Sequence, residues 1–278
     1  MAGVCTGFGR GGQAVRPGLV YDLGDVILRQ FLYADTACAS YLFGCTTHRL
    51  LAVVDPHIEL VDRYLEAAEA AGAPIVAVFD THVHADHVSG LPELVAATGA
   101  AGYLPAGAGV EFDHRPLADG DRVELGNTVV TALATPGHAP AHHTYLVADL
   151  RRMTDETWLA FTGDSLLVND AGRPDLHAGG GDPRELARLQ HASMRRLLEL
   201  PDYVLALPSH YGGSVCGRGL SGNPLSSIGF ERRHNAALAP AGVEEFVEAL
   251  LQNLPPAPPD QARIVAANRR GATAAPTA

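Results

Sequence analysis

A cluster of metal-binding side chains directly after a short apolar run constrains this chain more than any other feature. The run, residues 75–79, has the length and composition of a buried strand, and T-H-V-H-A-D-H follows at residues 81–87. A loop at a strand end can turn several side chains toward one point, whereas a continuing strand would aim them at opposite faces. The four potential ligands are His82, His84, Asp86 and His87.

Three later segments add ligands of the same kinds, each just after a predicted strand. They are T-P-G-H at residues 135–138, F-T-G-D at 161–164 and P-S-H at 208–210, and they contribute His138, Asp164 and His210. Polar turns would explain the glycines but not the repeated placement. Imidazole nitrogens and carboxylate oxygens suit zinc or iron(II) in an open, catalytic site. The set therefore predicts a catalytic metal centre.

The composition excludes several other classes of protein. The net charge is −11 and no basic run is longer than Arg-Arg, which argues against a nucleic-acid groove. No apolar run approaches the ~20 residues that cross a bilayer, and the N-terminus does not resemble a secretory signal, so we expect a cytoplasmic protein without a membrane partner. The cysteines lack a C-x-x-C pair, and we expect thiols and no cysteine-based zinc site. They are Cys5, Cys38, Cys45 and Cys216.

The chain is expected to form one domain over residues 18–254. Residues 1–17 are rich in glycine, and residues 255–278 in proline, alanine and arginine, so both ends are predicted to be poorly ordered. Both halves of the domain run from strands to helices, which predicts an α/β protein with two sheets packed together and helices outside. Strands are expected near 26–32, 40–43, 50–54, 75–79, 123–125, 129–133, 144–147, 158–161 and 203–207, and helices near 58–71, 91–97 and 183–200.

The ordered set H-x-H-x-D-H, G-H, G-D and a late histidine resembles the metallo-β-lactamase superfamily, over about residues 20 to 240. The resemblance implies an αββα sandwich, in which two central mixed sheets carry helices on their outer faces and the metal site lies at one edge between the sheets. By motif position, one metal site is His82, His84 and His138, the other is Asp86, His87 and His210, and Asp164 lies between them.

Three longer segments resemble persulfide dioxygenases, especially the rhodanese-linked members. They are residues 31–45, residues 161–176 with the G-R-P-D sequence, and residues 209–238. This resemblance implies one Fe(II) per chain and oxidation of a low-molecular-weight thiol persulfide by O2 to sulfite and free thiol, with a homodimer in keeping with the family. The implied iron ligands are His82, His138 and Asp164, and such a triad leaves positions for substrate sulfur and O2.

The residues of the second implied metal site are also compatible with other functions. Because Asp86, His87 and His210 are all present, the chain also resembles glyoxalase II, a dinuclear zinc hydrolase. Two Zn(II) ions would lower the pKa of a bridging water, which would attack a thioester carbonyl. A metal-binding protein without turnover and a β-lactam hydrolase are further alternatives.

Four residues are candidates for catalytic roles: Asp86, Arg173, Tyr211 and Cys216. Arg173 either forms a structural ion pair with Asp175 or acts near the metal. Tyr211 contacts substrate or packs its loop. Cys216 either receives persulfide sulfur or is a small buried apolar residue. His142 and His143 are not assigned to the metal, although His142 is a candidate for orienting a ligand.

Overall fold

The computed structural model describes residues 15–22, 26–152, 155–177, 182–240 and 242–273. Most of the N-terminal segment predicted to be poorly ordered, residues 1–14, lies outside these ranges. Residues 15–17 belong to the first strand.

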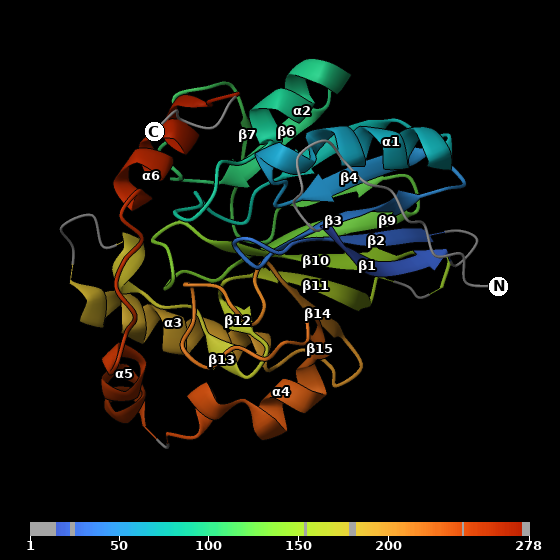
Figure 1. Ribbon diagram of the computed structural model, residues 1–278. Helices are drawn as coiled ribbons and strands as arrows, with labels where there is room; N and C mark the ends of the chain where they lie inside the picture. The colour runs from blue at the N-terminus through green and yellow to red at the C-terminus, as the bar shows by residue number, and fades with distance from the viewer. Residues whose placement is uncertain (1–14, 23–25, 153–154, 178–181, 241, 274–278) are drawn as a thin grey trace.

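The first sheet has seven strands that follow one another in chain order. The first four are antiparallel neighbours, and from β4 onward the strands run parallel. Its strands are β1 (Val15–Asp22), β2 (Val26–Tyr33), β3 (Cys38–Cys45), β4 (Leu50–Val54), β5 (Ile75–Phe79), β6 (Ala101–Pro105) and β7 (Arg115–Leu117). Parallel neighbours need a crossover, and α1 (Val61–Ala71) and α2 (Leu91–Thr98) supply two of these on the outer face (Figure 1).

The second sheet has six strands in the order β15-β14-β11-β10-β9-β8. All pairs are antiparallel except β11 with β14. Its strands are β8 (Arg122–Leu125), β9 (Thr128–Ala134), β10 (His143–Asp149), β11 (Thr157–Gly163), β14 (Leu205–Pro208) and β15 (Ser226–Ser227). The helices α3 (Pro183–Leu197), α4 (Ile228–His234) and α5 (Val243–Leu251) cover its outer face (Figure 1). A small hairpin, β12 (Leu166–Leu167) and β13 (Asp170–Ala171), leaves the end of β11.

Central strands such as β4 and β5 are buried on both faces, which explains why they read as continuous apolar runs. In β3 the side chains alternate. Tyr41 and Phe43 belong to the core between the two sheets, whereas Leu42 belongs to the core between the first sheet and its helices. A third core joins the second sheet to α3 and α5. The predicted sandwich of two mixed sheets with helices outside is confirmed.

The C-terminal tail differs from the prediction. Residues 255–278 were expected to be disordered, yet they contain the helix α6 (Gln261–Arg270), which lies beside the α2 end of the sandwich (Figure 1). Alanine and arginine are good helix formers. Val265 packs against the outer core of the first sheet, and Asn268 is buried. These tertiary contacts order a segment whose composition alone suggests disorder.

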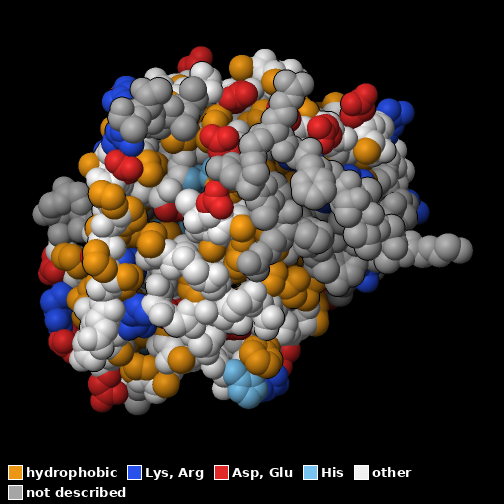
Figure 2. Space-filling model, viewed as in Figure 1, with side chains coloured by type: hydrophobic (Ala, Val, Ile, Leu, Met, Phe, Trp, Pro, Cys, Tyr) orange, Lys and Arg blue, Asp and Glu red, His pale blue; other side chains and the backbone are white. Residues whose placement is uncertain are grey.

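The surface carries charges of both signs. On the face shown in Figure 2, blue basic side chains lie among acidic and apolar ones, and they form no continuous basic stripe over the described residues. In the same part of the chain, none of the helices is both long and apolar enough to span a bilayer.

Candidate metal centre

The predicted ligands meet at one edge of the sandwich because the strands that precede them end there. β11 and β14 are parallel neighbours, with Phe161 beside Leu207 and Gly163 beside Pro208. The residues just beyond these strands, Asp164 and His210, are therefore neighbours too. The cluster at residues 81–87 follows β5 of the other sheet, and an isolated bridge between His82 and His142 joins the two sheets.

Three donor atoms from three loops face a common point. The carboxylate oxygen Oδ2 of Asp164 lies 3.3 Å from Nε2 of His138 and 4.0 Å from Nε2 of His82. All three side chains are almost completely buried, and their donor atoms lie within 4.8 Å of one another. This is the two-histidine, one-carboxylate set implied by the sequence resemblance.

The other ring nitrogen of each histidine is held by a partner outside this group. Nδ1 of His138 donates to the carbonyl oxygen of Arg173 at 2.8 Å. Nδ1 of His82 lies 2.9 Å from the Thr81 hydroxyl, which itself donates to Asp55. Such outer hydrogen bonds fix the tautomer so that Nε2 presents its lone pair to a metal. The donor set therefore fits a divalent metal ion.

His84 falls in a different donor group from this triad. Its Nε2 is 3.2 Å from the Asp55 carboxylate, and that group contains Asp55 and Asp80. The Nδ1 atom of His84 is buried without a hydrogen-bond partner, and its ring centroid is 4.3 Å from that of His82. Asp55 also accepts hydrogen bonds from Thr81 and Ser209. The sequence motif groups His84 with His82 and His138, but the structure groups Asp164 with those two histidines instead.

A second group contains three predicted ligands and one that was not predicted. Oδ2 of Asp86 lies 3.1 Å from Nδ1 of His87 and 2.8 Å from Nε2 of His210. The Cys38 sulfur lies among them, 3.3 Å from the same Asp86 oxygen. The sequence did not suggest a cysteine-based zinc site, and Cys38 nevertheless lies within a group of side chains that could hold a metal. Cys38 is 48 positions before Asp86, so no local spacing could reveal it.

Asp164 lies between the two groups, as expected from its motif position. Its Oδ2 belongs to the first group, while its Oδ1 accepts a hydrogen bond from Nδ1 of His210 at 2.7 Å. Burial alone would raise the pKa of Asp164, but His210 and His138 outweigh burial and hold that pKa well below its ordinary value. The carboxylate is thus ionised and ready to bind a cation at neutral pH.

The sequence profile of the metallo-beta-lactamase superfamily matches residues 34–210, which include every ligand in both groups. The chain belongs to this superfamily. A relative described as persulfide dioxygenase ETHE1, mitochondrial, from Bos taurus, is 29% identical over 233 residues, which is 83% of each chain. A hydroxyacylglutathione hydrolase from Rhodospirillum rubrum is 33% identical over 172 residues, 61% of this chain and 60% of the relative.

A solved structure shows the same relationship in three dimensions. The crystal structure of ETHE1 from Myxococcus xanthus superimposes with a TM-score of 0.75 at 33% identity, covering 87% of this chain and 98% of that one. The superfamily fold is therefore shared over nearly the whole of that relative.

Within this superfamily fold, the candidate catalytic residues beyond the ligands are buried. The Arg173 guanidinium donates two hydrogen bonds to Asp175, at 2.8 and 2.7 Å, while its backbone carbonyl holds His138. Tyr211 belongs to the core between the sheets. Cys216 is buried near Asp164 and His210, and burial raises the pKa of its thiol. Arg173 thus contacts a ligand of the first group through its backbone carbonyl, whereas Tyr211 packs in the core.

His142 supports the first group through hydrogen bonds without belonging to it. Its Nε2 accepts the backbone N–H of Asp164 at 3.1 Å, and its Nδ1 pairs with Thr135. Burial and the nearby His138 lower the pKa of His142 to about 3. A neutral ring can act as an acceptor, so His142 orients the loop that carries Asp164.

Gln190, on α3, connects two ligand loops and was not predicted from sequence. Its side-chain oxygen accepts the backbone N–H of His138 at 2.8 Å, and its amide donates to the backbone carbonyl of Ser165. Gly137 has φ of 147°, and a side chain there would overlap Gln190. Gln190 therefore fixes His138 and Asp164 relative to each other.

Replacing Gln190 by methionine is expected to destabilise the protein by about 2–4 kcal/mol, because it leaves a buried N–H and a buried carbonyl without partners. Urea denaturation measures this loss. The matched control is Gln252→Met at an exposed position, which should change the free energy of unfolding by less than about 0.5 kcal/mol. Equal effects of the two substitutions would contradict the role given to Gln190.

Proposed function

We propose that this protein is an iron(II)-dependent persulfide dioxygenase that oxidises a low-molecular-weight thiol persulfide with O2 to sulfite and free thiol. One observation carries the proposal. His82, His138 and Asp164 direct three donor atoms to one point, and the donor atoms within 4.8 Å of one another there do not include one from His84. Two histidines and one carboxylate on a single face are typical of oxygenases that use non-haem Fe(II).

Bound iron would supply open coordination positions at which a sulfur anion and O2 can be brought together. The reaction balances without another oxidant. The outer sulfur of the persulfide is oxidised, O2 is reduced, and O2 with one water supplies the three oxygens of sulfite. The sulfur–sulfur bond breaks, the inner sulfur leaves as a thiol, and two protons are released.

The chain prepares the three ligands for this role. Burial lowers the pKa of His138, so its ring stays neutral at physiological pH and Nε2 keeps its lone pair. Asp164 stays ionised because the charge and the hydrogen bond of His210 outweigh its burial. Arg173 holds Nδ1 of His138 through its own carbonyl, and Asp175 fixes the Arg173 side chain. Through these contacts, the G-R-P-D segment positions a metal ligand.

The comparisons support the same reading. The relatives described as persulfide dioxygenases match this chain over most of its length, whereas the Rhodospirillum rubrum hydrolase matches 61% of it. The complete second group of Asp86, His87 and His210 favours the alternative, a dinuclear zinc hydrolase of thioesters. The two functions differ in metal, substrate and use of O2.

An oxygen electrode separates these functions. Protein purified anaerobically and loaded with Fe(II) is expected to consume O2 when given glutathione persulfide and to release sulfite in equal amount. The same protein loaded with Zn(II) serves as the control, because zinc has no redox chemistry, and it should consume no O2. Thioester hydrolysis by the zinc form, without O2 uptake by the iron form, would replace the proposal by the hydrolase.

A further inference from the structure

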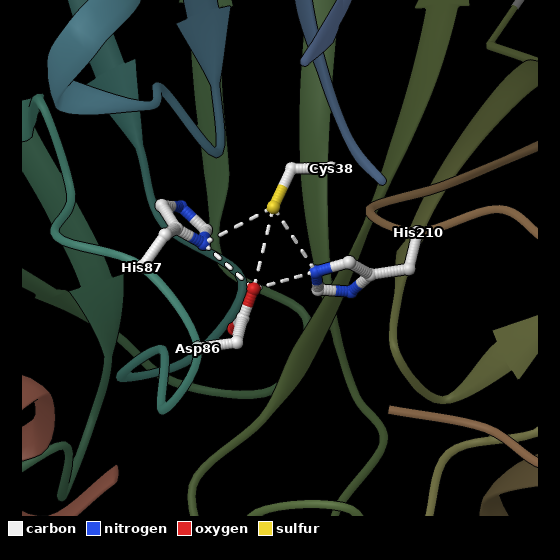
Figure 3. Close-up of side chains that lie close together, drawn as sticks. All are labelled: Cys38, Asp86, His87 and His210. Carbon is white, nitrogen blue, oxygen red and sulfur yellow. Dashed lines mark hydrogen bonds and ion pairs between the residues drawn. The ribbon is translucent and has the colours of Figure 1, made fainter. Parts of the chain in front are cut away.

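Four ligand side chains from three parts of the chain converge at the second group (Figure 3). The Cys38 sulfur lies 3.3 Å from Oδ2 of Asp86, 3.6 Å from Nδ1 of His87 and 3.4 Å from Nε2 of His210. All four side chains are at least nine-tenths buried. The other Asp86 oxygen, Oδ1, is buried without a hydrogen-bond partner.

The backbone holds Cys38 at this point. Cys38 begins β3, and an isolated antiparallel bridge pairs it with His210 in the segment after β14. Two backbone hydrogen bonds flank the pair, from Ala39 N to Ser209 O at 2.7 Å and from Tyr211 N to Ala37 O at 3.1 Å. The approach of sulfur to imidazole therefore follows from main-chain pairing between the two sheets.

The separations of the Cys38 sulfur and the Asp86 oxygen from the other donor atoms are close to those of a tetrahedral zinc site, and the two imidazole nitrogens lie within 4.8 Å of each other. Zinc bonds of about 2.0–2.2 Å to nitrogen or oxygen and about 2.3 Å to sulfur give donor separations of about 3.6 Å for pairs that include sulfur. The three sulfur separations here are 3.3 to 3.6 Å. The Asp86 oxygen is 2.8 and 3.1 Å from the two imidazole nitrogens, so these pairs need to open by only a few tenths of an ångström.

The charges also balance. A thiolate and a carboxylate carry two negative charges, which a divalent cation neutralises, and two neutral imidazoles complete the set. A buried ion is stable only when its charge is compensated in this way. The Thr36 hydroxyl lies 2.9 Å from the Cys38 sulfur and can donate a hydrogen bond to a thiolate.

We propose that Cys38, Asp86, His87 and His210 form a closed, four-ligand site for a thiophilic divalent metal, Zn(II) above all, with the Cys38 thiolate as the fourth ligand. The three other residues are expected from the superfamily motif, whereas the sulfur ligand follows from the pairing of β3 with the segment after β14. This inference does not depend on the dioxygenase assignment.

The fourth ligand changes what the second site can do. Catalytic zinc keeps one position for water or substrate, whereas structural zinc is surrounded by four protein ligands. With Cys38 in the fourth position, this site has no place for a bridging hydroxide. Its role is then structural, because it links β3, the loop after β5 and the segment after β14. The open coordination positions remain at the neighbouring triad of His82, His138 and Asp164.

Zinc X-ray absorption on the full-length protein loaded with Zn(II) tests the proposal. The spectrum should contain a sulfur neighbour at about 2.3 Å, because the triad has no sulfur ligand and the second site has Cys38. Cys38→Ser should remove this sulfur neighbour and weaken zinc binding at this site at least about 100-fold, more than the loss of an outer-sphere partner costs.

Two variants serve as controls. Cys45→Ser removes a buried thiol that pairs with His48, away from the metal ligands, and Cys216→Ser removes the thiol near Asp164 and His210. Both should keep the zinc–sulfur distance. A wild-type spectrum with only nitrogen and oxygen neighbours would overturn the proposal, even if Cys38→Ser failed to fold. Loss of the sulfur neighbour in Cys216→Ser would assign the ligand to Cys216 and also overturn it. Neither result bears on O2 uptake, which tests the proposed function separately.

Discussion

Asp164→Ala is expected to lower iron binding and persulfide oxidation by more than about 100-fold, because loss of an outer-sphere partner alone costs 10- to 100-fold. Asp164 is the carboxylate of the triad, and its second oxygen is hydrogen-bonded to His210. Removal leaves the buried Nδ1 of His210 without the partner that it has in Asp164. Breaking a buried pair in this way should also destabilise the metal-free protein by about 3–5 kcal/mol.

Metal content by mass spectrometry, sulfite release and chemical denaturation measure these effects separately. The matched control is Asp170→Ala, since Asp170 is an equally buried carboxylate whose partner is Arg218, outside the metal centre. Asp170→Ala should lower stability but keep one iron per chain. If Asp164→Ala retained iron and activity at wild-type levels, the triad would be wrong.

Asn268→Ala is expected to loosen the loop at residues 81–87, although Asn268 lies far away in the sequence, in α6. The Asn268 amide donates to the backbone carbonyls of His84 and His87 at 2.9 Å each, and its oxygen accepts the N–H of Ser89 at 2.9 Å. Loss of three buried hydrogen bonds should cost about 3 kcal/mol of stability at about 1 kcal/mol each. Because these bonds hold the loop that carries His82 and Asp86, metal affinity should fall about 10- to 100-fold.

Isothermal titration of the metal-free protein with Zn(II), together with urea denaturation, tests both effects. Asn235→Ala is the control, since Asn235 is also buried and also bonds several backbone groups, but next to β12 and β13. The two variants should lose similar stability, and only Asn268→Ala should lose metal affinity. Equal metal affinity in both would show that α6 stabilises the fold without positioning the ligands.

Sequence alone predicted most of the sheet strands, but not β1, β6, β7 or β15, and it singled out most residues of the two donor groups. The strands β4 and β5 were predicted at their observed bounds, because two-sided burial makes them short apolar runs between turn residues. Ligands at strand ends were also predictable, since loops at one edge of a sandwich bring their side chains together. Asp164 and His210 meet for this reason, as neighbours beyond the parallel strands β11 and β14.

The order of the C-terminal tail and the contacts of several supporting residues could be found only in the tertiary structure. The composition of residues 255–278 indicates disorder, but contacts of Val265 and Asn268 with distant segments hold α6 in place. Asn268 lies 184 positions after His84, and Gln190 lies 52 positions after His138. Polar residues of this kind show no sequence signal, because their role depends on backbone groups that become neighbours only on folding.

The cluster of metal-binding residues shows most clearly what the sequence reveals and what it does not. Its residues, at 82–87, identified a metal centre by local spacing, since four ligands in one short loop can reach one region without help from the rest of the fold. Which ligands belong together was decided by long-range contacts. Asp164 joins His82 and His138 in one donor group, whereas Nε2 of His84 is hydrogen-bonded to Asp55. Pairing of β3 with the segment after β14 brings Cys38 to His210 from 172 positions away. Side-chain direction and main-chain pairing across the two sheets are properties of the packed sandwich, so the residue order could not reveal them.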